Sequence, residues 1–465
     1  MDYAFLAREY NSEQWKNLIR ALFPAQADLF ASNTPITDVD SERIESFTQF
    51  GTLRLGDMAD TQLALFEIRL KPNTTKLQIN RVALREIVRK FNENALLSGA
   101  LAVFVDYEKG KWRFSFIAKS SRYDADGTLQ TWETEPKRYT YVFGDGEKTK
   151  TAEQRFKVLE GKKSKTLEDI AEAFSVEKVS NEFFIQYKEH YQKFCAYLYE
   201  YPSARQIFGD EKLIRDFAKK LLGRLVFLYF LQKKRWLGGK IGSGNWNDGE
   251  PDFIRLLFGH SATDRSRFYS QVLVPLYFRT LNTGEKERPG FAYRAPWGDV
   301  KVPFLNGGLF EEDPAGTEQF DFPEKLFADL LDLFDRYNFT IDESSSNDQE
   351  VGIDPEMLGH IFENLLEENR NKAGAFYTPK EIVHYLCQES LWQYLKNRLL
   401  PAQKPKDVIW SDSRLHDEAE LENFVRHKER GKKDGFIYKN AHVIERALRE
   451  VRICDPAIGS GAFPM

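Results

Sequence analysis

Residues 451–465, VRICDPAIGSGAFPM, decide the fold expected for the C-terminal part of the chain. The apolar stretch at their start predicts a β-strand from Val451 to Asp455, and a turn containing Gly459 and Gly461 follows it. Such a turn suits a nucleotide-like ligand at the carboxyl edge of a parallel sheet, because glycines let the backbone approach the ligand closely. A carboxylate at the strand end can hold an ammonium group, which suits the methionine part of S-adenosylmethionine better than a pyrophosphate.

A second motif, GAFYTP, occupies residues 374–379. Pro379 suits the first turn of a helix, where its missing N–H is no loss, and Thr378 is then placed to cap that helix. Phe376 and Tyr377 stand just before the cap. They can either cover a ligand or only pack the start of the helix against the core.

The segment at 374–379, followed later in the chain by the segment at 455–463, resembles the adenine-specific DNA methyltransferases of type I and type IIG restriction–modification systems. The stretch LGHIFENLLEE at residues 358–368 shares this resemblance. The resemblance implies a Rossmann-like α/β domain that binds S-adenosylmethionine and acts on double-stranded DNA. In that family the segment that corresponds to residues 374–379 covers the methionine end of the cofactor. The residues that the resemblance assigns to cofactor binding are Phe376, Tyr377, Thr378, Pro379, Asp455, Pro456, Ala457, Gly459, Gly461 and Phe463.

The family's catalytic motif, Asn/Asp-Pro-Pro-Tyr/Phe, holds the amino group of a base that is flipped out of the DNA helix. This motif should lie well downstream of residues 455–463, and the printed sequence contains no Asn-Pro dipeptide. We therefore expect that these residues do not methylate DNA alone, and that the sequence is an artificial or natural truncation.

The first 150 residues alternate between helix and strand patterns. The expected elements are a helix at 11–23 capped by Asn11 or Ser12, strands at 46–50, 52–57 and 63–71, a helix at 80–92, and strands at 100–107, 111–120 and 137–146. This order resembles the core of the PD-(D/E)XK nucleases. Their metal site uses an Asp at one strand end, and an acidic residue and a lysine on the next strand.

The nuclease resemblance assigns metal binding to Asp57, at the end of one expected strand, and to Glu67 on the next. Alternate residues of a strand share a face, so Glu67, Arg69 and Lys71 are expected together. Two carboxylates suit Mg²⁺, which can activate water and neutralise charge at a scissile phosphate. Arg69 stands where the nucleases have lysine and stays protonated, so Lys71 is the candidate substitute for that lysine.

Other interpretations of this N-terminal region stay open. Asp57 can be a turn residue, and Glu67 with Arg69 can form a surface ion pair. The region is then a degenerate nuclease-like fold or an unrelated α/β module.

Residues 151–345 have a mostly helical pattern, with helices expected at 166–174, 181–199 and 212–236. The glycine-rich stretch 238–249 lacks the Lys-Ser/Thr ending of a phosphate-binding loop, and we interpret it as a flexible surface connection. The basic residues between Arg205 and Lys240 either follow DNA phosphates or only flank an apolar helix segment.

Composition narrows the classes of protein. Hydrophobic residues make up 42% of the chain, which predicts a globular protein, and the net charge of −5 means that DNA contact depends on local basic faces. Three cysteines without disulfide or metal-ligand spacing favour a cytoplasmic protein. The apolar runs are too short to cross a membrane.

The expected architecture has three parts. These are an α/β nuclease-like domain at 1–150, a mostly α-helical connector at 151–345, and the start of a Rossmann-like α/β methyltransferase domain at 346–465, with a helix at 354–369, a helix from Pro379 to about Tyr394 and a solvated, charged insert at about 400–440.

Three functions fit these patterns. The first is a site-specific DNA adenine methyltransferase with endonuclease activity. The second is a phage-defence methyltransferase whose N-terminal domain binds DNA or partner proteins without cutting. The third is a non-catalytic module that binds DNA or a partner and regulates.

Overall fold

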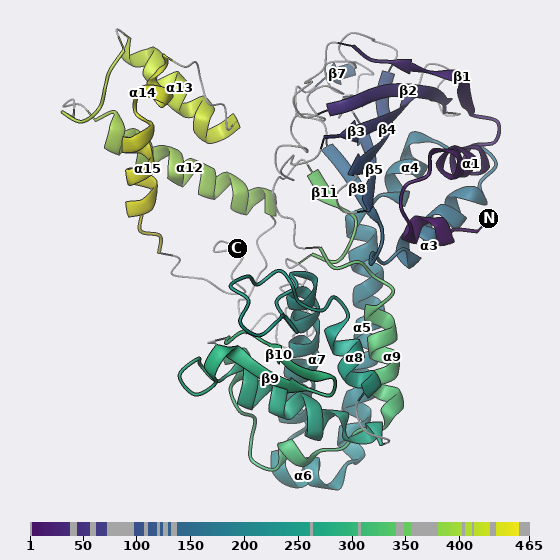
Figure 1. Cartoon of the computed structure of the whole chain (residues 1–465), viewed down its shortest axis with the longest axis vertical. Helices are drawn as coiled ribbons and strands as arrows, with labels where there is room; N and C mark the ends of the chain where they lie inside the picture. Colours follow the sequence, from purple (N-terminus) through teal and green to yellow (C-terminus); the bar gives the residue numbers. More distant parts are fainter. Residues whose placement is uncertain are drawn as a thin grey trace. The chain divides into compact units, whose positions relative to one another are not determined.

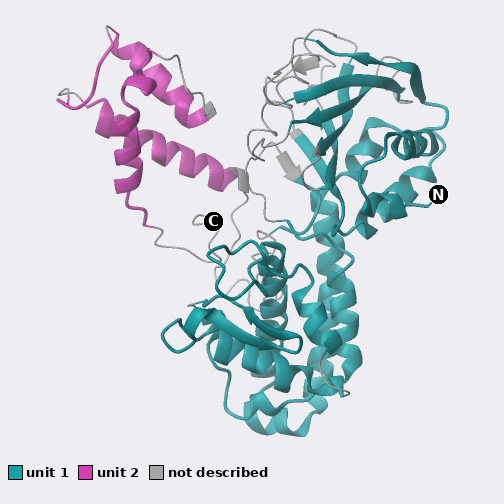
Figure 2. Ribbon diagram, in the orientation of Figure 1, with its two compact units in different colours: residues 1–365 teal, residues 366–465 magenta. Residues whose placement is uncertain are grey.

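The structure, a computed structural model, divides the chain into two compact units, residues 1–365 and 366–465 (Figure 2). It describes residues 2–37, 44–55, 62–71, 97–106, 110–118, 121–123, 129–131, 137–260, 264–305, 308–340, 348–354, 380–401, 405–411, 413–427 and 434–454. Among the helices in these ranges, none combines the length and the apolar character needed to span a bilayer.

Unit 1 contains a seven-stranded mixed sheet in the order β1-β2-β3-β4-β5-β8-β11 (Figure 1). The strands are β1 (Ala27–Pro35), β2 (Ile44–Arg54), β3 (Gln62–Leu70), β4 (Leu97–Asp106), β5 (Lys111–Ala118), β8 (Lys137–Gly144) and β11 (Asp348–Glu350). The pairs β3–β4 and β8–β11 are parallel, and the other neighbours are antiparallel. A separate pair joins β6 (Ser121–Tyr123) to β7 (Leu129–Thr131). Unit 1 is therefore an α/β fold, as the sequence predicts.

Three helices cover one face of the sheet: α1 (Ser12–Leu22), α3 (Lys150–Glu160) and α4 (Leu167–Ala173) (Figure 1). The prediction for α1 is confirmed, because Asn11 caps it by accepting a hydrogen bond from the N–H of Gln14 at 3.0 Å. The apolar face of α1 is buried with strand residues such as Phe114. The opposite face of the sheet carries a smaller core, which includes Phe66, Ile68 and Phe104.

The prediction of two separate strands at 46–50 and 52–57 was wrong. Residues 46–50 and 52–54 belong to the single strand β2, whose pairing with β3 shifts register between Gln49 and Gly51, and residues 56 and 57 lie outside the described residues. A glycine is needed there because a Cβ atom on Gly51 would lie 2.6 Å from the carbonyl oxygen of Asp28. The strand before β2 is β1, which the sequence analysis did not predict. The predicted helix at 80–92 lies outside the described residues.

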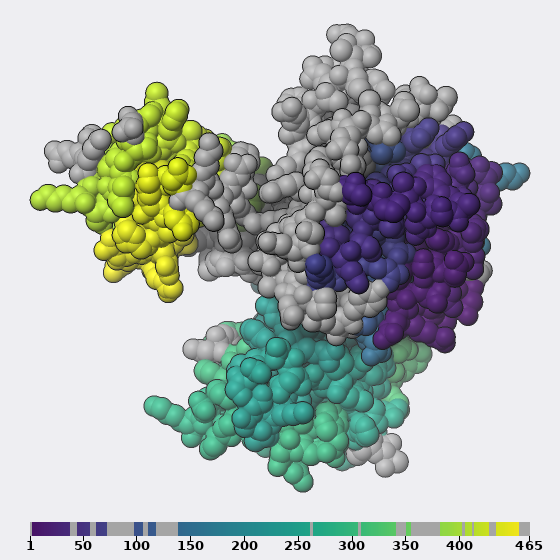
Figure 3. Space-filling view, turned by 45° about the horizontal axis from the view of Figure 1, so that its top comes forward, coloured from purple at the N-terminus to yellow at the C-terminus, as the bar shows by residue number. Residues whose placement is uncertain are grey.

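The remainder of unit 1 is mostly helical. Its long helices α5 (Val176–Glu200), α7 (Glu211–Lys233) and α9 (Glu324–Phe334) form the packed pairs α5–α7 and α5–α9. The predictions at 166–174, 181–199 and 212–236 are confirmed as α4, α5 and α7, with slightly different ends. Shorter elements are α6 (Pro202–Phe208), α8 (Phe253–His260), and the hairpin of β9 (Ala292–Ala295) and β10 (Gly298–Lys301). In the space-filling view the helical part, in teal and green, lies directly against the purple and blue sheet part (Figure 3).

The glycine-rich stretch 238–249 is attached to β10. Gly239 bridges to Lys301, the last residue of β10. The buried amine of Lys301 donates to the carbonyl oxygens of Ser243 and Asn245 and lies 4.2 Å from the centre of the Trp246 ring. This stretch is therefore held both by backbone hydrogen bonds to β10 and by the amine of Lys301.

After the helical part, the chain returns to the sheet. β11 pairs in parallel with β8, with Gln349 opposite Tyr139, and the N–H of Val351 donates to the carbonyl oxygen of Thr140 at 2.7 Å. The sheet thus contains strands that precede the helical part in the sequence and one strand, β11, that follows it. The predicted helix at 354–369 lies almost entirely outside the described residues.

Unit 2 is helical where it is described. It contains α12 (Lys380–Leu399), α13 (Arg414–His427), α14 (Phe436–Lys439) and α15 (Ala441–Glu450). The helix predicted from Pro379 is confirmed as α12. The charged segment predicted to be a solvated insert at 400–440 was partly misjudged, because Leu421 and Phe436 lie in a core with residues of α12 and α15.

The strand predicted from Val451 to Asp455 is not formed over residues 451–454. Ile453 in this stretch is 86% exposed. A strand is stabilised by pairing with a neighbour, and the described residues of unit 2 contain no other strand. Asp455 itself lies outside the described residues.

Candidate functional site

Glu67 lies on β3, and the residues around it alternate between the two faces of the sheet as predicted. Leu63 and Leu65 belong to the core beneath α1, whereas Phe66 and Ile68 belong to the core of the opposite face. By this alternation Glu67 lies on the α1 face of the sheet. It therefore places a buried acidic group on the same face as the apolar residues Leu63 and Leu65.

The carboxylate of Glu67 is buried, with 6% of the residue exposed, and it accepts three hydrogen bonds. The hydroxyl groups of Tyr10 and Ser12 donate to Oε2 at 2.7 and 2.9 Å. Nε of Arg69 donates to Oε1 at 2.9 Å. Burial, and then the charge of Glu67, raise the pKa of Tyr10 well above its usual value, so this phenol remains a donor.

Arg69 connects the buried carboxylate to the surface. Its side chain is 30% exposed, and its guanidinium lies 6.0 Å from the centre of the Tyr10 ring. The pair is therefore not a ladder between two exposed side chains, because its acidic partner is enclosed. Lys71 is exposed and comes directly after the end of β3.

Asp57, the other predicted metal ligand, lies outside the described residues. The last residue of β2, Arg54, pairs with Gln62. Gln62 precedes Glu67 by five positions, so the end of β2 lies about 17 Å from Glu67 along the sheet. In the described part of the chain, no group of three or more His, Cys, Asp or Glu side chains is arranged to hold a metal ion.

Glu67 nevertheless suits a hard cation by the chemistry of its donor atoms. A carboxylate has about four acceptor positions, and the three hydrogen bonds described above use three of them. Oxygen is also the ligand that Mg²⁺ prefers. One position, on Oε1, is left by these three contacts.

Tyr10 and Ser12 were not predicted from the sequence as partners of Glu67. They flank Asn11, the predicted helix cap, and a cap residue indicates where a helix begins but not which strand the helix start contacts. The contacts to Glu67 span 57 and 55 residues. No local pattern contains that information.

The predicted cofactor residues, at 376–379 and in the 455–463 motif, lie outside the described residues. The structure describes the helices that border these two motifs in the sequence. α12 begins at Lys380, immediately after Pro379, as expected for a proline at the start of a helix. α15 ends at Glu450, shortly before the second motif.

Most of the basic residues predicted to follow DNA contact their own chain instead. Arg224 is fully buried and forms an ion pair with Asp313 at 2.5 Å, and Lys220 contacts the same carboxylate at 3.0 Å. Lys219 pairs with Asp216 within α7. The alternative, a buried apolar helix flanked by basic residues, describes α7 better.

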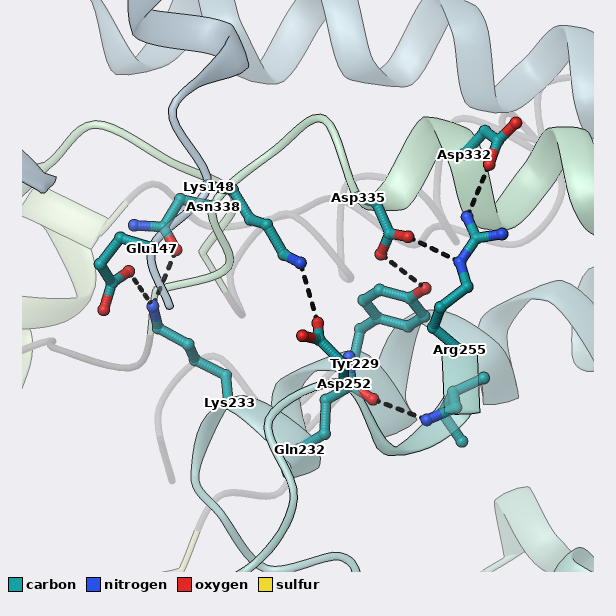
Figure 4. Close-up of polar contacts among 11 residues, drawn as sticks. Glu147, Lys148, Tyr229, Gln232, Lys233, Asp252, Arg255, Asp332, Asp335 and Asn338 are labelled. Atoms are coloured by element: carbon teal, nitrogen blue, oxygen red, sulfur yellow. Dashed lines mark hydrogen bonds and ion pairs between the residues drawn. The ribbon is translucent and has the colours of Figure 1, made fainter. Parts of the chain in front are cut away.

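A polar junction joins the sheet to the helical part within unit 1 (Figure 4). Lys233, at the end of α7, donates to Glu147 Oε2 at 2.6 Å and to Asn338 Oδ1 at 2.8 Å. Lys111 of β5 pairs with the other oxygen of Glu147, and Asn338 donates to Glu350 of β11 at 3.2 Å. Burial opposes ionisation of Glu147, but Lys233 and Lys111 outweigh it and lower its pKa to about 2.

The second arm of this junction connects α7, α8 and α9 (Figure 4). Arg255 of α8 pairs with Asp332 and Asp335, both at 2.7 Å. The hydroxyl of Tyr229 on α7 donates to Asp335 at 3.1 Å. Lys148, next to Glu147, pairs with Asp252 at 2.8 Å. The junction is a chain of satisfied polar contacts, which suits a structural role.

Over 258 residues, or 54% of this chain, the sequence is 28% identical to a Methanocaldococcus jannaschii protein provisionally described as a type II restriction enzyme and methyltransferase. The matched part is 20% of that protein, so the chain spans about a fifth of the length of its relative. No protein-family profile matches the chain, and no solved structure matches it.

Proposed function

We propose that the chain is part of a site-specific DNA adenine methyltransferase and restriction endonuclease of a restriction–modification or phage-defence system. The observation that carries this proposal is the pair of segments at 374–379 and 455–463, in the order found in the adenine methyltransferases. The similarity to an M. jannaschii protein described as both restriction enzyme and methyltransferase supports it. Double-stranded DNA is the substrate, and the three unpaired cysteines suit a cytoplasmic enzyme.

S-adenosylmethionine is the cofactor in this proposal. Asp455 holds its ammonium group, and Gly459 and Gly461 let the backbone approach it. Phe376 and Tyr377 cover its methionine end. Methyl transfer also needs an Asn/Asp-Pro-Pro-Tyr/Phe motif, which the printed residues do not contain.

The cofactor assignment is tested with Asp455→Ala and Gly459→Val in the complete protein. Both changes should abolish binding of S-adenosylmethionine in calorimetry, because the first removes the partner of the ammonium group and the second adds a side chain where the ligand approaches. Glu445→Ala is a matched control, since Glu445 is exposed and pairs only with Arg449 within α15 among its described contacts. Unchanged affinity in Asp455→Ala would refute the assignment.

For the N-terminal sheet we propose a nuclease of the PD-(D/E)XK kind. The supporting observation is the strand arrangement, with antiparallel β1, β2 and β3 after α1 and a parallel β4 beside β3. Asp57 and Glu67 are the proposed Mg²⁺ ligands, with Arg69 and Lys71 near the scissile phosphate. When bound, the ion supplies charge neutralisation and activation of water.

Glu67→Ala in the complete protein tests this nuclease site. Cutting should be lost while methylation continues, because the two chemistries use separate residues. Glu13→Gln is the matched control, since Glu13 is an exposed residue in the first turn of α1. Cutting by Glu67→Ala at the parental rate would place the metal site elsewhere.

The second candidate is a defence methyltransferase whose N-terminal domain binds DNA or partner proteins without cutting. Arg69 favours it, because this residue replaces the expected lysine and is hydrogen-bonded to Glu67. A complete protein that never cuts DNA with Mg²⁺ or Mn²⁺ would select this candidate. Cutting regained in Arg69→Lys would then show that only the lysine is missing.

A further inference from the structure

The three donors around Glu67 are distributed unevenly over its two oxygens. Oε2 accepts from both Tyr10 and Ser12, at 2.7 and 2.9 Å. Oε1 accepts only from Arg69 among the hydrogen bonds described for it. Because each carboxylate oxygen has about two acceptor positions, Oε2 is saturated and Oε1 retains one.

Tyr10 and Ser12 are held in place by the packing of the chain around them. Asn11, between them, is fixed by its hydrogen bond from the N–H of Gln14. The Tyr10 ring lies 5.4 Å from the ring of Trp112, on β5. Trp15, one turn into α1, contacts both Trp112 and Phe114 edge to face, at 5.5 and 4.3 Å. The two hydroxyl groups are therefore presented to Glu67 by a packed aromatic core.

We propose that Tyr10 and Ser12 are positioning residues of the nuclease site: they hold Oε2 of Glu67 and leave Oε1, beside Arg69, as the oxygen that serves the site. The inference rests on the proposed nuclease function. It makes the residues just before and at the start of α1 part of that site through their hydrogen bonds to Glu67. Arg69 contacts this same oxygen, Oε1, directly.

The test compares Ser12→Ala with Ser12→Thr in the complete protein. Threonine keeps the hydroxyl group and alanine removes it. Loss of a group that orients a ligand typically lowers metal affinity or activity by roughly 10–100-fold. Ser12→Ala should therefore raise the Mg²⁺ concentration for half-maximal cutting by about this factor, and Ser12→Thr should restore the parental value.

Three further measurements separate positioning from a general loss of structure. Mn²⁺ affinity, measured by calorimetry without DNA, should fall in Ser12→Ala and in Tyr10→Phe but not in Ser12→Thr. The urea midpoint of each variant and its methylation rate show whether the protein is still folded. If Tyr10→Phe does not fold, the two Ser12 variants decide the question alone.

The outcomes distinguish this inference from the proposed function. If Glu67→Ala still cuts, or the parent neither cuts nor binds Mn²⁺, the nuclease site is wrong and the inference fails with it. If Glu67→Ala abolishes cutting but Ser12→Ala and Tyr10→Phe keep the parental Mn²⁺ affinity and Mg²⁺ dependence, only the inference is overturned. A fall in the urea midpoint without a change in metal affinity also overturns it.

Discussion

The amine of Lys233 lies 2.6 Å from a carboxylate oxygen of Glu147, so the last residue of α7 is bound to the turn that follows β8. Glu147 is 7% exposed and holds Lys111 of β5 with its other oxygen. One buried carboxylate thus joins the sheet to the helical part of unit 1. Replacing Glu147 should therefore weaken the attachment between the sheet and the helical part.

We expect Glu147→Gln to destabilise the protein at neutral pH by roughly 1–3 kcal/mol, because two lysines lose their charged partner. The folded-state pKa of Glu147 is lowered from 4.5 to about 2. The stabilisation by the charged carboxylate is therefore present above about pH 4.5 and is lost as the pH falls towards 2. The urea midpoints of parent and variant should converge over that range. A difference that does not change with pH would contradict this prediction.

Arg224 and Asp313 form an ion pair that is almost completely enclosed, with 0% and 3% of their side chains exposed. Arg224 also donates to the carbonyl oxygens of Leu309 and Glu311. Asp313→Asn should lower the free energy of unfolding by about 3–5 kcal/mol, because it leaves a buried guanidinium without its counter-charge.

The control for this prediction is Asp299→Asn. Asp299 pairs with Arg294 on the exposed β9–β10 hairpin, and exposed pairs contribute about 0–1 kcal/mol. Equal effects of the two substitutions on the urea midpoint would show that the enclosure of Asp313 has no energetic consequence.

Gly51→Ala should destabilise the sheet by about 1–3 kcal/mol, because the added Cβ meets the carbonyl oxygen of Asp28 on β1. Gly259→Ala is the matched control. Gly259 lies in α8, and a Cβ atom added to it would have no neighbouring atom within 4 Å, so the change should be neutral or stabilise by up to roughly 1 kcal/mol. Thermal unfolding of the two variants checks the difference. If Gly51→Ala is as stable as the parent, β1 must shift to make room for the added Cβ atom, and the prediction is wrong.

The 465 printed residues should transfer no methyl group to DNA, because they contain no Asn/Asp-Pro-Pro-Tyr/Phe motif to hold the target base. Incubation with labelled S-adenosylmethionine and mixed genomic DNA measures this. Label in the DNA would show that another segment of this chain performs that task.

The long helices were predictable because their apolar residues recur with helical spacing, as in α1 and α5. β1 was missed because ADLFASNTP contains Asp28, Ser32, Asn33 and Pro35, which are typical of turns, and because an edge strand needs little apolar patterning. β11 has only three polar residues, DQE, and exists through its pairing with β8. Its position depends on residues far away in the sequence.

The candidate site divides in the same way. The shared face of Glu67 and Arg69 follows from the two-residue period of a strand, and the structure places them in contact. The donors on Oε2 come from residues 10 and 12, whose arrival at β3 is set by how α1 packs on the sheet. Local pattern therefore predicted the carboxylate and its neighbour Arg69, but not the two hydroxyl donors Tyr10 and Ser12. The cofactor motifs stay predictions.

The return of β11 to β8 has a consequence for folding during synthesis. The ribosome releases β8 before residues 145–347, and the strand that covers its edge comes after them. Until then the edge of β8 at residues 138–140 lacks the strand that pairs with it, and such an edge can pair with strands of other chains. Completion of the sheet requires closure of a loop that contains the whole helical part, although the entropy of closure grows only slowly with length. We expect slower translation before β11 emerges to prolong the interval in which this edge can pair with other chains.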